Sequence, residues 1–258
     1  MDYRNLKLTP EGSTAVLTLN RPERRNALSS ELMAEMLAAL DEVEAKDCYR
    51  ALIIAAAGKA FCAGHDLSEM AGLEEAEYRR LFALCSELMR RVHEISIPVI
   101  AEVQGIATAA GCQLVAACDL AIASEDATFA TPGVRIGLFC STPMVPLTRS
   151  IGRKRAMEML MTGREIDAGT AASWGLVNRV VAKEELLLAT RELAQRISEA
   201  SAYTVATGKR AFYQQVDMNE NNAYTCVKEV MTANALAPDA QEGISAFLAK
   251  RAPVWPGS

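Results

Sequence analysis

Apolar positions in the first half of the chain fall into short continuous runs and into longer segments with helical spacing. The runs at 14–20, 51–57 and 99–104 are rich in Val, Ile, Leu and Ala, which is typical of buried strands. Residues 29–46 and 74–95 place apolar side chains three or four positions apart, which predicts amphipathic helices. This alternation of strands and helices predicts an α/β fold.

Helical spacing dominates after residue 141. Gly and Pro residues separate the segments, and we expect helices at 143–150, 153–161, 167–173, 184–199, 202–215, 220–235 and 239–249. We therefore expect two regions, an α/β core over 1–190 and a helical C-terminal region over 191–258. The sequence has no internal repeat and no low-complexity linker between these regions.

The strand predicted at 51–57 leads into a stretch of small residues, 59–68, which is the first candidate for chemistry. Gly64 permits a backbone turn that a residue with a Cβ would resist, and Asp66 can cap a following helix. A strand that ends in small residues before a helix leaves backbone N–H groups without partners, and such groups can hold negative charge that develops on oxygen. An ordinary strand-to-helix turn would contain the same residue types.

Residues 99–113 repeat this arrangement. An apolar strand is followed by Gly105, by a run of small residues and by an apolar helix that we expect to begin near Ala109. The first N–H groups of that helix, and the positive end of its dipole, would point out of the turn. If the two turns lie side by side, two backbone donors meet at one point and form an oxyanion hole.

Composition and charge exclude several classes of protein. Half of the 258 residues are hydrophobic, and the net charge of −5 argues against general nucleic-acid binding. The seven cysteines are scattered, which favours free thiols in a reducing compartment. The first residues lack the apolar core that is typical of a signal peptide, so we expect none. We also find no apolar stretch long enough to span a membrane and no metal-ligand spacing. We expect a cytoplasmic protein that binds neither nucleic acid, membranes nor a metal.

Several short motifs occur in one order along nearly the whole chain. They are 19–22 with 26–28, 61–67, Gly105 with 110–112, 118–120 with Phe129, 160–163, Ala171 with 175–177, and 242–248 with 250–251. On these motifs the chain resembles the crotonase family, the enoyl-CoA hydratase/isomerase superfamily. The resemblance implies a crotonase-like ββα spiral with an α-helical C-terminal oligomerisation region, and therefore a homotrimer or a hexamer.

The resemblance also implies the ligand and its contacts. The substrate would be an acyl-CoA thioester, so CoA enters as part of the substrate and no separate cofactor is expected. The two oxyanion N–H groups would belong to His65 and Ala110, while the His65 ring would either lie near the thioester or only pack beside it. Residues expected to contact CoA, the last two from a neighbouring subunit, are Arg25, Ala63, Asp66, Leu67, Ser68, Phe247 and Lys250.

One departure from the family pattern bears on the reaction. The two glutamates with which hydratases of this family activate water align with Gln113 and Gly133. The Gln amide does not titrate, and Gly has no side chain. An Asp used by other branches falls near Ser141, which makes Ser141 a candidate pocket residue. Loss of one positioned acid or base typically removes about 10²–10⁴-fold of rate, so we expect a poor hydratase.

Two classes of function stay open at this point. The first is an enzyme that stabilises a thioester oxyanion or enolate, with decarboxylation of a malonyl-type CoA, isomerisation or weak hydration as possible reactions. The second is a non-catalytic paralogue that binds acyl-CoA or assembles with partners. The intact oxyanion motifs favour the first class, whereas the missing glutamates favour the second class or the decarboxylase.

Overall fold

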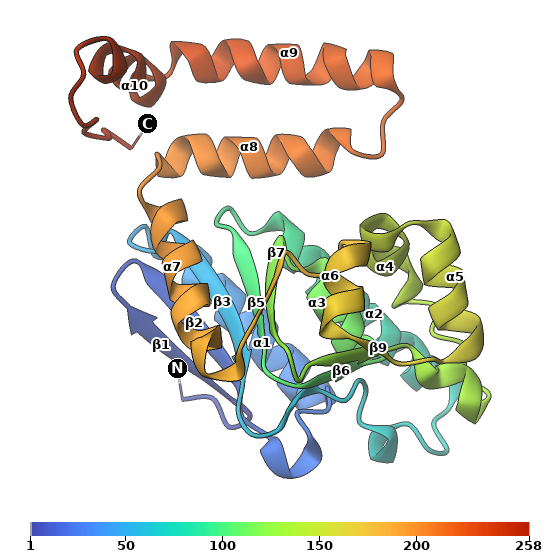
Figure 1. Cartoon of the computed structure of the whole chain (residues 1–258). Helices are drawn as coiled ribbons and strands as arrows, with labels where there is room; N and C mark the ends of the chain where they lie inside the picture. Colours follow the sequence, from blue (N-terminus) through green and yellow to red (C-terminus); the bar gives the residue numbers. More distant parts are fainter. Residues whose placement is uncertain (1, 258) are drawn as a thin grey trace.

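The computed structural model describes residues 2–257, which form a six-stranded and a four-stranded sheet (Figure 1). The larger sheet is parallel except for its β1–β2 pair. Its strands, in spatial order, are β1 (Leu6–Glu11), β2 (Thr14–Leu19), β3 (Ala51–Ala56), β5 (Val99–Val103), β7 (Leu120–Ser124) and β10 (Arg179–Val181). Those of the smaller sheet are β4 (Ala60–Cys62), β6 (Ile106–Thr108), β8 (Thr128–Ala130) and β9 (Ile166–Asp167).

The chain passes repeatedly from the larger sheet to the smaller one and then into a helix. Strand β3 is followed by β4 and by helix α2 (Glu75–Glu94), and β5 is followed by β6 and by helix α3 (Ala110–Ala117). Strands β7 and β8 repeat the crossing before the short helix η3 (Pro132–Ile136). This succession is the predicted ββα spiral, and it brings the ends of β4, β6 and β8 together at one edge.

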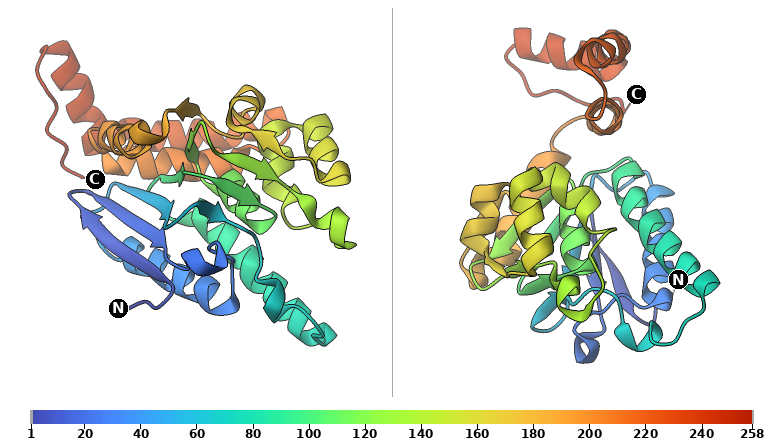
Figure 2. Two further views of the ribbon diagram at one scale, coloured as in Figure 1. Left: turned by 60° about the horizontal axis from the view of Figure 1, so that its bottom comes forward. Right: turned by 90° about the vertical axis from the view of Figure 1, so that its right-hand side faces the viewer.

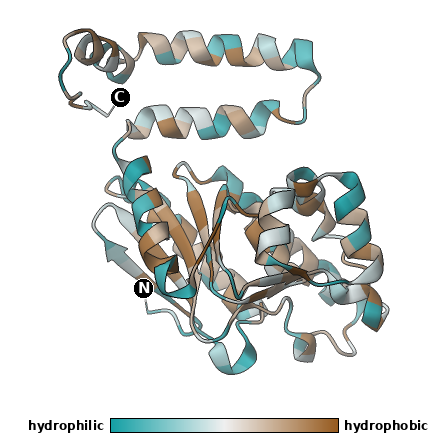
Figure 3. Ribbon diagram, viewed as in Figure 1, coloured by the Kyte–Doolittle hydropathy of each residue, from teal (hydrophilic) through white to brown (hydrophobic). Residues whose placement is uncertain are grey.

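Burial on both faces explains the continuous apolar runs of the larger sheet. Alternate residues of a strand point to opposite faces. On one face Leu52 and Ile54 join the main core with helices α1 (Ser30–Glu44) and α2. On the other face Ile53 packs with Ala194 of helix α7 (Leu186–Ser198). Figure 3 shows the hydrophobic strands between these helices.

Several of the helix starts predicted from the sequence have a local side-chain cap, among them those of α1 and α2. The Ser29 hydroxyl accepts a hydrogen bond from the Leu32 N–H (3.1 Å) and caps α1. At the start of α2, the side chains of Glu74 and Glu77 form a reciprocal capping box. Such caps typically contribute about 1 kcal/mol each.

All the helices predicted after residue 141 are present, with ends shifted by at most one or two residues. Helices α4 (Met144–Ile151), α5 (Arg153–Thr162) and α6 (Ala168–Trp174) complete the core. Helix α7 crosses the predicted boundary at 190 and lies on the sheet. The predicted regions also include residues 1 and 258, which lie outside the described residues. No helix among those described combines the length and apolar character needed to cross a bilayer.

Residues 202–257, here called the C-terminal arm, stand away from the core (Figures 1 and 2). The arm contains α8 (Ala202–Gln215), α9 (Glu220–Leu236) and α10 (Pro238–Leu248). Large apolar side chains that the arm leaves exposed include Tyr224, Met231, Leu236, Ile244, Phe247 and Leu248. Because apolar surface of this extent usually marks an interaction face, the arm has the character of an assembly element.

A buried ion pair anchors the arm to the core. The Lys209 Nζ lies 2.7 Å from an Asp119 carboxylate oxygen and also donates to the carbonyls of Val92 (3.0 Å) and Ile97 (2.9 Å). The Tyr213 hydroxyl donates to the same carboxylate at 2.7 Å. Asp119 lies just beyond the C-terminal end of α3. These contacts therefore hold α8, the first helix of the arm, close to the C-terminal end of α3.

Candidate functional site

The first turn exposes a backbone donor at His65. The Leu28 N–H donates to the Gly64 carbonyl at 2.7 Å, and the Asp66 N–H donates to the Leu28 carbonyl at 3.0 Å. These bonds form a parallel bridge between Leu28 and His65. In such a bridge the N–H of the central residue points away from its partner. Within residues 2–257 the His65 N–H donates to no acceptor, which is the condition that the predicted oxyanion role requires.

The second turn exposes a backbone donor at Ala110. The Ala109 N–H donates to the Ala130 carbonyl at 2.9 Å, which ties the turn to β8. Ala109 itself has φ 51° and ψ −118°, a conformation that residues with a Cβ rarely adopt. The dihedral angles of Ala109 set the orientation of the next N–H group, which belongs to Ala110, the first residue of α3. Among the described residues the Ala110 N–H has no acceptor.

The two turns touch each other, and glycines make the contact possible. At Gly64, which has φ +90°, a Cβ would lie only 2.8 Å from the Cβ of Ala109 and 3.3 Å from the Ala110 nitrogen. At Gly111 a Cβ would lie 2.1 Å from the Cys62 carbonyl oxygen, so α3 packs directly on β4. The His65 and Ala110 donors are therefore on adjoining backbone segments, and both residues line the same cavity.

That cavity, here called the turn cavity, has a volume of about 480 Å³. Its lining comes from the two turns, from Phe82 of α2 and from the segment 132–143. The lining is mainly apolar. Among residues 2–257 it contains no carboxylate, and its side chains with a polar or charged group are those of His65, Thr108, Arg135, Cys140, Ser141 and Thr142. Burial raises the pKa of the Cys140 thiol above its ordinary value, so the thiol is a poor nucleophile at neutral pH.

Asp66 and Ser68 hold the first turn with their side chains. An Asp66 oxygen accepts from the Ser68 N–H (3.2 Å) and hydroxyl (2.6 Å), and the other accepts from Arg21 at 3.1 Å. Hydrogen bonding to Ser68, followed by that to Arg21, lowers the pKa of the Asp66 carboxyl. The side chain of Leu67 is half exposed and lines the turn cavity.

The other predicted CoA contacts fall in two places. The Arg25 carbonyl accepts from the Ala63 N–H at 3.0 Å, which sets Arg25 beside the first turn with its side chain exposed. Phe247 is 82% exposed on α10, and Lys250 follows that helix. Both lie on the arm, away from the turn cavity of their own chain (Figure 1).

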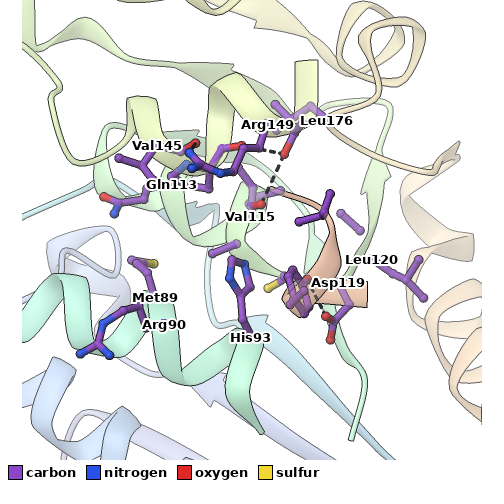
Figure 4. A pocket seen from close by; sticks show the side chains of 18 of the residues that line it. Met89, Arg90, His93, Gln113, Val115, Asp119, Leu120, Val145, Arg149 and Leu176 are labelled. Carbon is purple, nitrogen blue, oxygen red and sulfur yellow. Dashed lines mark hydrogen bonds between the residues drawn. The ribbon is translucent and has the colours of Figure 1, made fainter. Parts of the chain in front are cut away.

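Gln113 and Gly133 line different cavities. Gln113 is buried on α3 and lines a second cavity of about 780 Å³ between the core and α8, together with His93 and Arg149 (Figure 4). The Cys85 thiol donates to the Gln113 amide oxygen at 3.9 Å. Gly133 is buried in η3 and lines the turn cavity. Thr142 lines both cavities, so they are adjacent.

Ser141 lines the turn cavity. Its hydroxyl donates to the Phe139 carbonyl at 3.3 Å. Sequence reasoning missed two participants, Ala109 and Phe82. Nothing in the residue type of Ala109 indicates its rare backbone conformation, and Phe82 reads only as one apolar residue of α2. Among the described residues no group of three or more His, Cys, Asp or Glu side chains could hold a metal ion.

Replacing Ala109 with glycine is expected to stabilise the protein. The backbone strain at a non-glycine residue in such a conformation costs about 1–3 kcal/mol, part of which is offset by the greater chain entropy of unfolded glycine. We expect a net gain of about 1 kcal/mol, which raises the melting temperature by about 2–4 °C. Ala110→Gly is the matched control, because Ala110 is helical and should lose stability. Equal destabilisation by both changes, in thermal unfolding, would show that Ala109 carries no strain.

The ββα spiral and the two touching turns define a protein of the crotonase fold. The sequence profile described as Enoyl-CoA hydratase/isomerase matches residues 9–258, and the chain belongs to this family. It is 45% identical to the Danio rerio protein named enoyl-CoA hydratase domain-containing protein 3, mitochondrial, over 98% of this chain and 89% of that protein.

Two solved structures agree with this assignment. A crystal structure of enoyl-CoA hydratase from Mycobacterium smegmatis superposes with a TM-score of 0.95 and 46% identity, covering 98% of this chain and 99% of that one. The human enoyl-CoA hydratase domain-containing protein 3 gives a TM-score of 0.95 and 41% identity, covering 98% and 100% of the two chains. The predicted fold class is therefore confirmed, including the helical C-terminal region.

The predicted cytoplasmic location is wrong by this comparison. The Danio rerio relative carries the word mitochondrial in its name, as do relatives from Rattus norvegicus and Homo sapiens. The expectation rested on composition. All seven cysteines are free thiols within the described residues, and free thiols are compatible with either compartment.

Proposed function

We propose that this protein binds acyl-CoA thioesters and stabilises an oxyanion or enolate with the N–H groups of His65 and Ala110. One observation carries the proposal: two backbone donors without acceptors lie on touching turns at the wall of one apolar cavity. Donors held in place in a water-poor cavity favour charge that develops on oxygen. Family membership supports the ligand class, because crotonase family members bind acyl-CoA substrates.

Decarboxylation of a malonyl-type CoA is the reaction that best suits the residues present. Loss of CO₂ leaves the bonding electron pair on the α-carbon, from which it moves onto the thioester oxygen. The two N–H groups would stabilise that oxygen, and no side chain has to remove a proton. Neither the Gln113 amide nor Gly133 can act as a base, and the turn cavity has no carboxylate in its lining. Protonation of the α-carbon by water completes the reaction.

The alternative function is a non-catalytic acyl-CoA-binding paralogue. The lack of a carboxylate in the lining favours it equally, whereas the strained conformation of Ala109 favours catalysis, because backbone strain tends to persist at functional sites. The deciding experiment incubates the protein with saturated, enoyl, hydroxyacyl and malonyl-type CoA esters and follows their masses. Loss of CO₂ from a malonyl-type ester supports the decarboxylase. Tight binding of an ester without any product supports the paralogue.

We expect the protein to assemble with threefold symmetry as a homotrimer or a hexamer. The exposed apolar face of the arm and the position of Phe247 and Lys250, outside their own turn cavity, motivate this expectation. We propose the division into a spiral core and a C-terminal assembly region on the same grounds. Light scattering at micromolar concentration should give three or six times the mass of one chain. A monomer at that concentration would contradict the proposal.

A further inference from the structure

The His65 imidazole is an unsatisfied polar group in the wall of the turn cavity. Both of its ring nitrogens are buried and have no hydrogen-bond partner among the described residues. Buried polar side-chain atoms in native proteins nearly always have a partner, so each exception needs an explanation. The predicted oxyanion role concerns only the backbone N–H of this residue and leaves the ring unexplained.

Packing holds the ring in this position without satisfying it. The edge of the ring meets Phe82 of α2 in a T-shaped contact, with centroids 5.8 Å apart and an interplanar angle of 75°. Burial lowers the pKa of the imidazole, against smaller opposing effects of the Leu28 backbone and the Glu69 carboxylate. The Leu28 backbone thus lies near enough to act on the ring, but neither ring nitrogen forms a hydrogen bond of acceptable geometry among the described residues. Because burial lowers its pKa, the ring is neutral at pH 7 and offers one N–H donor and one acceptor nitrogen.

The His65 ring lies in the cavity that is proposed to hold the acyl group of the CoA thioester. It belongs to the residue whose N–H is proposed to bind the thioester carbonyl, and it lines the same cavity as Ala110. Ser141 offers less to a ligand, because its hydroxyl already donates to the Phe139 carbonyl. The ring thus stands out as a polar group that an incoming acyl substituent could satisfy. Because both nitrogens are buried, the substituent reaches them when a neighbouring side chain of the cavity lining moves aside.

We propose that the His65 imidazole hydrogen-bonds an oxygen substituent on the acyl group, so that the turn cavity selects hydroxyacyl- or ketoacyl-CoA over the matching alkyl acyl-CoA. This inference rests on the proposed acyl-CoA function and names the class of substrate. A hydroxyl group can both donate to and accept from a neutral imidazole. An alkyl chain leaves both ring nitrogens unpaired, and a site with unpaired buried polar groups disfavours such a ligand.

The test compares the affinities of butyryl-CoA, acetoacetyl-CoA and 3-hydroxybutyryl-CoA of each configuration by calorimetry. The wild type should bind at least one oxygenated ester about tenfold more tightly than butyryl-CoA, as expected for one added hydrogen bond. His65→Phe keeps the backbone N–H and an aromatic ring beside Phe82. It should reduce that ratio to about one without weakening the binding of butyryl-CoA. His65→Gln restores a donor and an acceptor and should recover part of the ratio.

Ser141→Ala tests the hydroxyl of Ser141 in the same cavity. A ratio that falls in this variant but not in His65→Phe would assign the selectivity to Ser141 and overturn the inference. A wild-type ratio near one, or an unchanged ratio in a folded His65→Phe protein, would overturn the inference while leaving the acyl-CoA function intact. Equal weakening of all esters and of free CoA would also overturn it, because the ring would then contact the CoA moiety. Failure of the wild type to bind any ester would refute the proposed function itself.

Discussion

Ala110→Pro is expected to slow product formation by about 10²–10³-fold, the usual effect of losing one oxyanion donor. The substrate is the acyl-CoA that the mass assay identifies. Proline has no N–H, so the substitution removes a backbone donor that most other side-chain changes leave in place. Ala110 is the first residue of α3, the position at which a helix tolerates proline best. The change should therefore preserve the helix while it removes the donor and places the proline Cδ where the N–H hydrogen was.

Ala110→Gly is the comparison, because it keeps the N–H and removes only a methyl group. Its rate should stay within a few-fold of wild type. If no ester is turned over, the same variants are compared by their affinities for butyryl-CoA and for the thioether S-butyl-CoA, which lacks the carbonyl oxygen. A folded Ala110→Pro protein with a rate, or a thioester preference, close to wild type would exclude Ala110 as an oxyanion donor.

Periodicity and capping were enough to predict most of the helices, because those signals act within one or two turns of chain. Ser29 is an example, since its hydroxyl bonds to an N–H only three residues away. The strands of the smaller sheet were not predicted. Strand β4 has three residues, Ala60–Cys62, and pairs with β6, which begins more than forty residues later. Pairing at that sequence distance leaves no local periodic pattern.

Strand β1 was missed for a related reason. Of its six residues only Leu6 is buried, because β1 lies at the edge of the larger sheet and exposes most of its side chains. At the site, the spacing of glycines indicated both turns. It could not indicate that Gly64 touches Ala109 or that Ala109 has a positive φ, since those facts depend on how two distant segments pack. The unpaired His65 ring is likewise visible only once its surroundings are known.

The unmodified protein is expected to hydrate crotonyl-CoA at least about 10²–10⁴-fold more slowly than a family hydratase that carries both glutamates. Gln113 can hydrogen-bond a water molecule but cannot take its proton, and Gly133 offers no side chain. The rate is measured as loss of the ultraviolet absorbance of the conjugated enoyl thioester, with the glutamate-containing hydratase assayed in parallel. A rate close to that of the hydratase would show that another residue activates the water, and Ser141 and His65 would be the first to replace.

Introducing a glutamate at position 113 alone is expected to change the hydration rate little. Gln113→Glu should raise hydration by less than about tenfold, because two carboxylates that hold one water act as a unit. Burial raises the pKa of a carboxyl group, and Gln113 is only 3% exposed. The Gln113→Glu variant should therefore match wild-type stability below about pH 4, where the introduced carboxyl is neutral in both the folded and unfolded states, and lose stability as the pH rises above it. Denaturant unfolding over this pH range measures the difference.

Restoring the second glutamate is expected to fail for a steric reason. The obstacle at Gly133 is not its φ, which is not positive. A Cβ there would lie 2.1 Å from the Leu138 carbonyl oxygen and 2.8 Å from the Cys140 sulfur. The Leu138 N–H also donates to the Gly133 carbonyl at 3.0 Å, so the loop closes tightly on this residue. Gly133→Ala should therefore destabilise the protein by itself, and adding Gly133→Glu to Gln113→Glu should not yield a hydratase. A stable double variant with high hydratase activity would show that the loop 133–140 can move aside and that missing carboxylates alone suppress hydration.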